Sequence, residues 1–207
     1  MTENDKQTEE KIFDAATDVF LEKGLDGSRM QDIASQAGIN KSLLHYYYRT
    51  KDQLFNSVFE MIARKMLRKF APVFDTNLSL EEKIRFFFKE HISFLQENPR
   101  LPGFLLNELN RNPARIKKIL DNIEINDLWA TFLDQHGNEL EKYNITKESI
   151  PQLMTSIAAI SVFPFAARGI IEAILEKAGI DFNSYIEERK LFAADFVISA
   201  LKKQKTD

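Results

Sequence analysis

The sequence contains no cysteine among its 207 residues and only three histidines. Disulfides, thiol nucleophiles and cysteine-ligated metal sites are therefore excluded, and an all-histidine zinc site has few residues to draw on. No apolar run approaches the roughly 20 residues that a membrane-spanning helix needs, and residues 1–10 are too polar for a secretory signal. We therefore expect a cytoplasmic protein with no metal, no cofactor and no membrane partner.

Glycine and proline are also scarce, with seven and six residues respectively. Apolar residues recur mostly at three and four positions, which is the spacing that buries one face of a helix. Because 44% of the residues are hydrophobic, the chain can bury a sizeable core. The sequence therefore predicts an all-α protein of one domain or two small ones.

The net charge of −3 argues against a protein that coats nucleic acid in general. A sum over the whole chain can nevertheless hide a local patch of the opposite sign. Between residues 41 and 69 the basic residues are Lys41, Arg49, Lys51, Arg64, Lys65, Arg68 and Lys69, against only Asp52 and Glu60. Positive charge is thus concentrated in one short stretch.

Residues 30–52 contain the pattern around which the chain is organised. Residues 30–37 predict a short helix, and Gly38 supplies the positive φ that a tight turn requires. Asn40 is a suitable N-cap for a second short helix, and Thr50 for the helix after it. Two short helices joined through a glycine are typical of a helix-turn-helix. A protein that addresses DNA is therefore expected.

An earlier helix is expected between a cap at Thr8 and a glycine stop at Gly24. Apolar residues recur along it at three and four positions and make one stripe for burial: Ile12, Ala15, Ala16, Val19 and Phe20.

The second short helix has an apolar side and a polar side. Leu44 and Tyr48 lie four residues apart and should pack inward, so Lys41, Ser42, His45 and Tyr46 project the other way. Lysine, serine and histidine can reach bases or phosphates, and a tyrosine can bond a phosphate. Three consecutive aromatic residues, at positions 46–48, cannot all face the core. Lys51 lies in the first turn of the next helix, where it could help hold a phosphate.

Residues from about Thr8 to Phe55 resemble the DNA-binding domain of the TetR family of bacterial transcriptional regulators. The similar segments are residues 32–34, 37–41, 44–48 and 51–55. His45 stands where the family often has a tyrosine that contacts phosphate. Arg29 stands where serine or threonine is common, so Ser28 is expected to cap the helix from residue 30.

The resemblance implies a double-stranded DNA operator as partner. We predict that the DNA-binding residues are Ser28, Arg29, Gln31, Lys41, Ser42, His45, Tyr46, Tyr47 and Lys51. It also implies a helix-turn-helix domain over residues 1–51, a connecting helix and linker over 52–78, and a C-terminal helical domain for effector binding and dimerisation over 79–207.

In the C-terminal part, the box Ser79–Glu82 predicts the start of a helix. Pro99 and Pro102–Gly103 are expected to bracket a turn. A short helix is expected over 104–109, and a longer one from Ala114 that loosens near Gly137. The apolar segment 150–175 should break at residues 163–165 because it contains a proline. A last helix is expected over about 183–203.

The last two helices are apolar on more than one face, which predicts burial on both sides. In the TetR family these helices pair with those of a second subunit. The resemblance therefore implies a homodimer through the two C-terminal helices and a palindromic operator.

The resemblance also implies a small-molecule effector, and the many aromatic residues are consistent with an apolar or aromatic one. The candidate ligand-binding residues are His91, Phe88, Glu108, Trp129, Phe163 and Arg168. Each has an ordinary interpretation as well: the phenylalanines as core, His91 as a satisfied core histidine, and Arg168 as a surface residue. The sequence does not identify the effector or the operator.

Two alternatives to a ligand-released repressor stay open. One is a helix-turn-helix regulator whose C-terminal domain only dimerises, which a closed, partly polar cavity would argue against. The other is an enzyme that uses His91 or Glu108. No nucleophile-base pairing, glycine-rich phosphate loop or metal-ligand spacing supports an enzyme, and we predict no catalytic residue.

Overall fold

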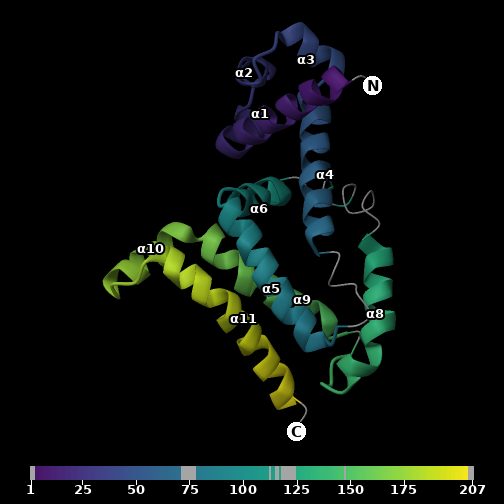
Figure 1. The fold of residues 1–207 in the computed structure, drawn as a ribbon, viewed down its shortest axis with the longest axis vertical. Helices are drawn as coiled ribbons and strands as arrows, with labels where there is room; N and C mark the ends of the chain where they lie inside the picture. The colour runs from purple at the N-terminus through teal and green to yellow at the C-terminus, as the bar shows by residue number, and fades with distance from the viewer. Residues whose placement is uncertain are drawn as a thin grey trace. The chain divides into compact units, whose positions relative to one another are not determined.

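The computed structural model describes residues 3–70, 78–111, 113–114, 117, 125–146 and 148–204. This part of the chain contains ten helices and no strand (Figure 1), so the all-α prediction is confirmed. The helices are α1 (Glu3–Gly27), α2 (Met30–Gln36), α3 (Lys41–Tyr47), α4 (Lys51–Phe70), α5 (Leu80–Glu97), α6 (Leu101–Arg111), α8 (Ile125–Glu141), α9 (Ile150–Ala166), α10 (Arg168–Lys177) and α11 (Phe182–Gln204).

The contacts within the chain divide it into two compact units, each of which is described by itself. The first unit combines Met1–Lys65 with Phe104–Ile123, and the second combines Met66–Gly103 with Glu124–Asp207. This division differs from the three consecutive segments predicted from the sequence, because most of α6 packs with the N-terminal helices. Both α4 and α6 contain a boundary between the units.

The first unit has one apolar core, which α1, α2, α3 and the beginning of α4 share. The Phe20 ring meets the Phe55 ring edge-on, with centroids 5.1 Å apart, and Phe104 of α6 lies 5.8 Å from Phe55. The fully buried members of this core include residues predicted to lie inward: Ile12, Ala16, Val19, Phe20, Ile33, Ala34 and Leu44. These contacts hold the two short helices in a fixed position on α1.

The turns around the two short helices follow their local signals. Gly38 has a φ of 68°, as predicted. Asn40 Oδ1 accepts from the backbone N–H of Leu43 at 2.7 Å, and Thr50 Oγ1 accepts from that of Gln53 at 3.1 Å. Both caps are therefore confirmed.

Helix α1 differs from its prediction at its first end. It begins at Glu3, so Thr8 lies inside the helix and is not its cap. At the other end the helical geometry breaks at Gly24, as predicted, with φ 68° and ψ 177°. This ψ is not that of the left-handed C-cap expected there, and the helix resumes to Gly27.

In the second unit, α5 packs against both α9 and α11 (Figure 1). The predicted capping box is present, because Ser79 and Glu82 each satisfy a backbone N–H of the other. The predicted turn between Pro99 and Pro102–Gly103 is present at residues 98–100, and α6 begins at Leu101, three residues earlier than expected. Helix α8 continues through Gly137 to Glu141, whereas most residues between 114 and 125 lie outside the described part.

Pro164 lies inside α9, and α10 follows at an angle of 76°. Proline has no N–H, so the carbonyl of Ile160 loses its usual helical donor. Arg189 of α11 supplies that donor twice, from Nε at 3.1 Å and from Nη2 at 2.9 Å. The predicted break is therefore present, but it lies at Ala167, a few residues later than expected.

Within the described residues, no single helix has both the length and the apolar composition needed to cross a bilayer. Only α9 and α10 taken together meet that requirement, despite the bend between them.

Candidate DNA-binding surface and ligand cavity

Helix α3 has a buried side and an outward side, as its residue spacing predicts. Leu44 and Tyr48 are buried in the core of the first unit. The residues predicted to project the other way all lie at the surface, and Tyr46 is 81% exposed: Lys41, Ser42, His45 and Tyr46. An ammonium, an imidazole and two hydroxyl groups therefore point outward from one short helix.

Tyr47 differs from Tyr46 because its hydroxyl is held within the protein. It donates to Asp5 Oδ1 of α1 at 3.1 Å, and its ring meets the Tyr46 ring edge-on, with centroids 5.5 Å apart. Desolvation and the neighbouring Asp5 carboxylate raise the pKa of the Tyr47 hydroxyl. Tyr47 thus ties α3 to α1 and supports the Tyr46 ring.

Ser28 and Arg29, at the start of α2, have opposite environments. Ser28 is buried, and its hydroxyl donates to the carbonyls of Val19 and Gly24. It closes the end of α1, so the predicted contact of Ser28 with DNA is corrected. Arg29 occupies the N-cap position of α2 without a side-chain cap, so the expectation that Ser28 caps this helix is wrong. The Arg29 side chain is exposed.

Lys51 holds the turn that precedes α2. Its Nζ donates to the carbonyls of Ser28 at 2.8 Å and Asp26 at 3.3 Å. These bonds join the beginning of α4 to the end of α1, which sequence reasoning did not foresee. The phosphate contact of Lys51 stays a prediction, and it competes with these internal bonds.

Gln31 and His45 are both exposed. Gln31 Nε2 lies 3.4 Å from Ser35 Oγ in the same helix, and His45 Nδ1 lies 3.3 Å from the Arg49 carbonyl oxygen. Such contacts at the surface are weak, so both side chains can turn toward another molecule.

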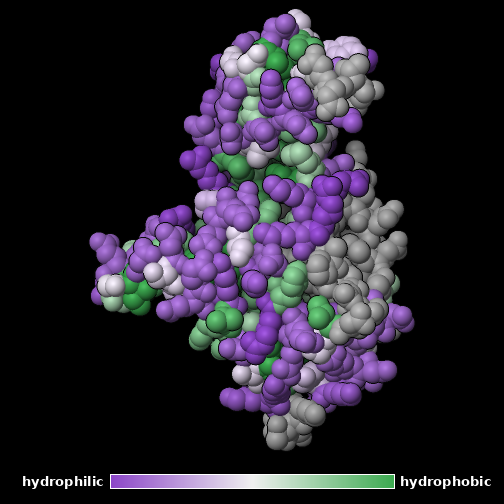
Figure 2. Space-filling view, viewed as in Figure 1, coloured by the Kyte–Doolittle hydropathy of each residue, from purple (hydrophilic) through white to green (hydrophobic). Residues whose placement is uncertain are grey.

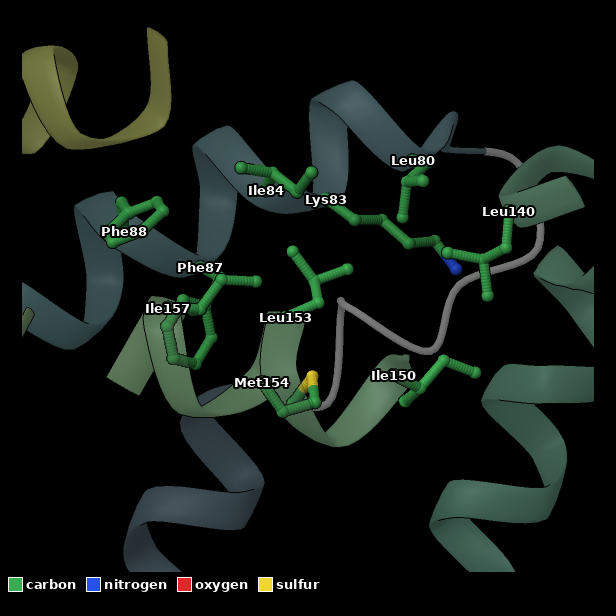
Figure 3. Close-up of a pocket in the computed structure, with 10 residues that line it drawn as sticks. All are labelled: Leu80, Lys83, Ile84, Phe87, Phe88, Leu140, Ile150, Leu153, Met154 and Ile157. Atoms are coloured by element: carbon green, nitrogen blue, oxygen red, sulfur yellow. The ribbon is translucent and has the colours of Figure 1, made fainter. Parts of the chain in front are cut away.

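The second unit contains an apolar cavity of about 80 Å³ between α5, α8 and α9 (Figure 3). Among the predicted ligand-binding residues whose side chains the structure describes, only Phe88 lines it. Lys83, which sequence reasoning missed, lines it too and is only 1% exposed. The sequence could have indicated that Lys83 faces the cavity, since it stands four residues before Phe87 on the apolar side of α5. The lining residues are Leu80, Lys83, Ile84, Phe87, Phe88, Leu140, Ile150, Leu153, Met154 and Ile157.

His91 lies behind the cavity lining and contacts Phe87, with ring centroids 4.9 Å apart. Its Nδ1 lies 3.0 Å from Ser161 Oγ, and the Ser161 hydroxyl donates to the Ile157 carbonyl at 3.0 Å. Burial lowers the pKa of His91 to about 4. His91 is therefore a neutral, hydrogen-bonded core histidine at pH 7, which is the ordinary interpretation of this residue.

Glu108 belongs to the first unit and not to the cavity. It is buried, and its Oε1 accepts from the backbone N–H of Leu25 at 3.1 Å. The predicted ligand contact of Glu108 is therefore corrected. Nearby, Arg111 Nη1 lies 3.3 Å from Asp26 Oδ2, so α6 contacts the break in α1 at two points.

The other predicted ligand contacts also lie away from the cavity. Phe163 is 55% exposed on α9. Arg168 is exposed, pairs with Glu172 at 2.8 Å, and lies over the Phe182 ring at 4.6 Å. Neither residue lines this cavity, and their contact with a ligand stays a prediction. The side chain of Trp129 lies outside the described residues.

Large apolar side chains are exposed on α9, α10 and α11, and Figure 2 shows green, apolar atoms over α10 and α11. The Phe192 and Phe196 rings stack with centroids 6.1 Å apart. We call this set the apolar face: Met154, Phe163, Ile170, Ile174, Ile180, Leu191, Phe192 and Phe196.

Residues 12–58 match the family described as bacterial regulatory proteins, tetR family. A probable HTH-type transcriptional regulator of Bacillus subtilis, YttP, is 22% identical over 89% of this chain and 91% of its own. IcaR, the negative regulator of the biofilm operon icaADBC of Staphylococcus epidermidis, is 31% identical over 39% of this chain and 43% of its own.

Two solved structures have a similar fold over nearly the whole chain. A TetR-like transcriptional regulator from Rhodococcus has a TM-score of 0.61 and 21% identity, covering 92% of this chain and 96% of its own. The regulator FadR from Bacillus subtilis, in complex with stearoyl-CoA, has a TM-score of 0.64 and 16% identity, covering 92% and 97%.

Proposed function

We propose that this chain is a DNA-binding transcriptional regulator of the TetR family, not an enzyme, and that it acts as a cytoplasmic repressor; the N-terminal match and the similar fold support this. It binds a palindromic operator as a homodimer and is released by a small apolar or aromatic ligand. The observation that carries this proposal is the outward side of α3, where Lys41, Ser42, His45 and Tyr46 are exposed together.

In a helix-turn-helix, the second short helix enters the major groove and its first residues contact base edges. Lys41 and Ser42 occupy these first positions in α3. Tyr46 lies one turn later, where its hydroxyl can bond a phosphate and its ring can pack on a thymine methyl group. Gln31, Arg29 and Tyr47 are proposed as further contacts at the edge of this surface.

The homodimer is supported by the apolar face on α9, α10 and α11. Exposed apolar patches of this kind mark interaction sites, because water would otherwise cover them at a cost in free energy. A second copy with the same face would cover both surfaces, and a two-fold dimer carries two copies of α3. The operator is therefore proposed to contain two half-sites in inverted order.

The cavity between α5, α8 and α9 offers space for an apolar ligand, but it is not the closed, partly polar cavity that would argue against a regulator that only dimerises. FadR, which has the same fold, holds stearoyl-CoA, so this fold accommodates an acyl ligand. A ligand releases DNA only if it binds the DNA-incompetent conformation more tightly than the competent one. Its differential affinity, and not its affinity alone, sets the response.

Footprinting of the DNA upstream of the protein's own gene tests the proposal. We expect one protected site with two-fold sequence symmetry, and a Tyr46→Ala variant should lose the protection while staying folded. Sedimentation of the free protein should give the mass of a dimer. A protected site without two-fold symmetry, or a monomer in solution, would contradict the homodimer.

A further inference from the structure

The beginning of α1 lies beside α3 (Figure 1), and its side chains hold the hydroxyl of Tyr47. Tyr47 Oη donates to Asp5 Oδ1 at 3.1 Å. A hydrogen bond from Thr8 acts on the same hydroxyl, where it opposes the rise in its pKa. Asp5 and Thr8 belong to the first two turns of α1. The position of the Tyr47 side chain is therefore set by a helix outside the helix-turn-helix pair α2 and α3.

The Tyr47 ring in turn supports the Tyr46 ring. The two rings meet edge-on, with centroids 5.5 Å apart and planes at 90°, which is a favourable geometry for an aromatic pair. Tyr46 is 81% exposed, whereas Tyr47 is half-buried. A chain of contacts thus runs from the Asp5 carboxylate through Tyr47 to the most exposed aromatic side chain of α3.

The bond to Asp5 also limits what the Tyr47 hydroxyl can do. A phenol has one proton to donate, and a phosphate oxygen only accepts. While Asp5 holds that proton, the Tyr47 hydroxyl has none for a DNA phosphate. The proposed contact of Tyr47 with DNA therefore falls to its ring or to a donor group of a base.

We propose that Asp5 is a positioning residue for DNA binding. It fixes the Tyr47 side chain, and Tyr47 holds the Tyr46 ring in the orientation that meets the DNA. A side chain that is free to change rotamer loses conformational entropy when it binds, and that loss weakens the complex. The inference rests on the proposed function, because it takes the outward side of α3 as the DNA-binding surface.

The test compares Asp5→Ala with Asp5→Asn. Both changes remove the same negative charge, so both alter the general attraction to DNA equally, but only asparagine keeps an oxygen acceptor for Tyr47. Fluorescence anisotropy at low salt, with a duplex of the footprinted sequence, measures the affinities. Asp5→Ala should bind about two- to tenfold more weakly than Asp5→Asn, the range for immobilising one side chain. Their salt slopes should be the same, because neither change removes a phosphate contact.

The same pair of changes in a Tyr46→Ala background separates positioning from a general effect on the fold. The difference between Asp5→Ala and Asp5→Asn should disappear there, because no ring remains to be held. A difference that persists would mean that Asp5 acts on the first unit in another way, and it would overturn the inference. Asp14→Ala and Asp14→Asn are the matched control, since Asp14 is exposed on the same helix, and the two should bind equally.

Two further outcomes distinguish the inference from the proposed function. Equal affinities of the two Asp5 variants, beside a weakened Tyr46→Ala, would overturn the inference alone. If the unmodified protein does not bind the duplex, or Tyr46→Ala binds it as tightly as the unmodified protein, the proposed surface on α3 fails and the inference fails with it.

Discussion

The Glu108 carboxylate accepts a hydrogen bond from the backbone N–H of Leu25, with Oε1 and N 3.1 Å apart and both residues buried. Leu25 follows the break at Gly24, where α1 loses its helical geometry. A side chain 83 residues further along the chain thus satisfies a backbone group that the break exposes. Helix α6 and the turn before α2 are therefore coupled inside the first unit.

Replacing Glu108 with alanine should destabilise the protein by about 1–3 kcal/mol, because it leaves a buried N–H without an acceptor. Glu108→Gln keeps an oxygen acceptor and should lose much less. Urea unfolding of the two variants measures the difference. If alanine and glutamine have the same effect, the hydrogen bond does not account for the role of Glu108.

Gly24→Ala should destabilise the protein by about 1–2 kcal/mol, since an alanine at positive φ is strained. The new Cβ would also lie 3.2 Å from Glu108 Oε1. Gly38→Ala tests backbone strain without a steric clash. Its φ is also 68°, and a Cβ added there has no contact within 4 Å beyond the neighbouring residues in the chain. Gly27 has no positive φ, so Gly27→Ala is the control. Thermal unfolding should rank the variants in that order, and an unaffected Gly24→Ala would contradict the expected strain.

Lys41→Ala should weaken operator binding and lower the slope of log affinity against log salt concentration by about 1 if Lys41 contacts a phosphate. Fluorescence anisotropy at several salt concentrations measures both quantities. Lys142→Ala, which removes an exposed lysine of the second unit, is the control. A lower affinity with an unchanged salt slope and an altered operator preference would instead place Lys41 on a base.

His91 should make the protein less stable as the pH falls. Burial lowers its pKa from 6.5 to about 4 in the folded state, so between these values the unfolded chain binds more protons than the folded one. Stability then falls with decreasing pH by up to about 1.4 kcal/mol per pH unit. Above about pH 6.5 this contribution is fully present.

The matched variant is His91→Gln, which cannot titrate. Urea unfolding of both proteins between pH 4 and 7 isolates the contribution of His91, because the remaining groups are shared. The slope against pH should be shallower in the variant. Parallel slopes would mean that His91 is not neutral in the folded protein.

Short-range signals in the sequence predicted several turns and caps, although the caps at Thr8 and Ser28 were wrong. Gly38, Asn40 and the Ser79–Glu82 box form their bonds with residues a few positions away, so their partners are visible in the sequence itself. The burial of Leu44 and Tyr48 followed from helical periodicity. These features account for the success at α3 and at the start of α5.

Other features that the sequence did not predict depend on bonds between residues that are distant in the sequence. The partners of Glu108 and Arg189 lie 83 and 29 residues away, and no local pattern distinguishes such residues from solvated ones. Ser28 has the residue type of a cap, but after the break at Gly24 its hydroxyl donates back to the Val19 and Gly24 carbonyls of α1. The cavity lies in the C-terminal part, where ligand contacts were predicted, but most of its lining residues are not among the predicted ones.

The bond between Arg189 and the Ile160 carbonyl fixes α11 to α9 at the point where proline interrupts the helix. Both helices carry residues of the apolar face. Since the bond holds them together within one subunit, the surface is pre-organised before a partner arrives. Association then loses less conformational entropy than it would with two helices free to slide.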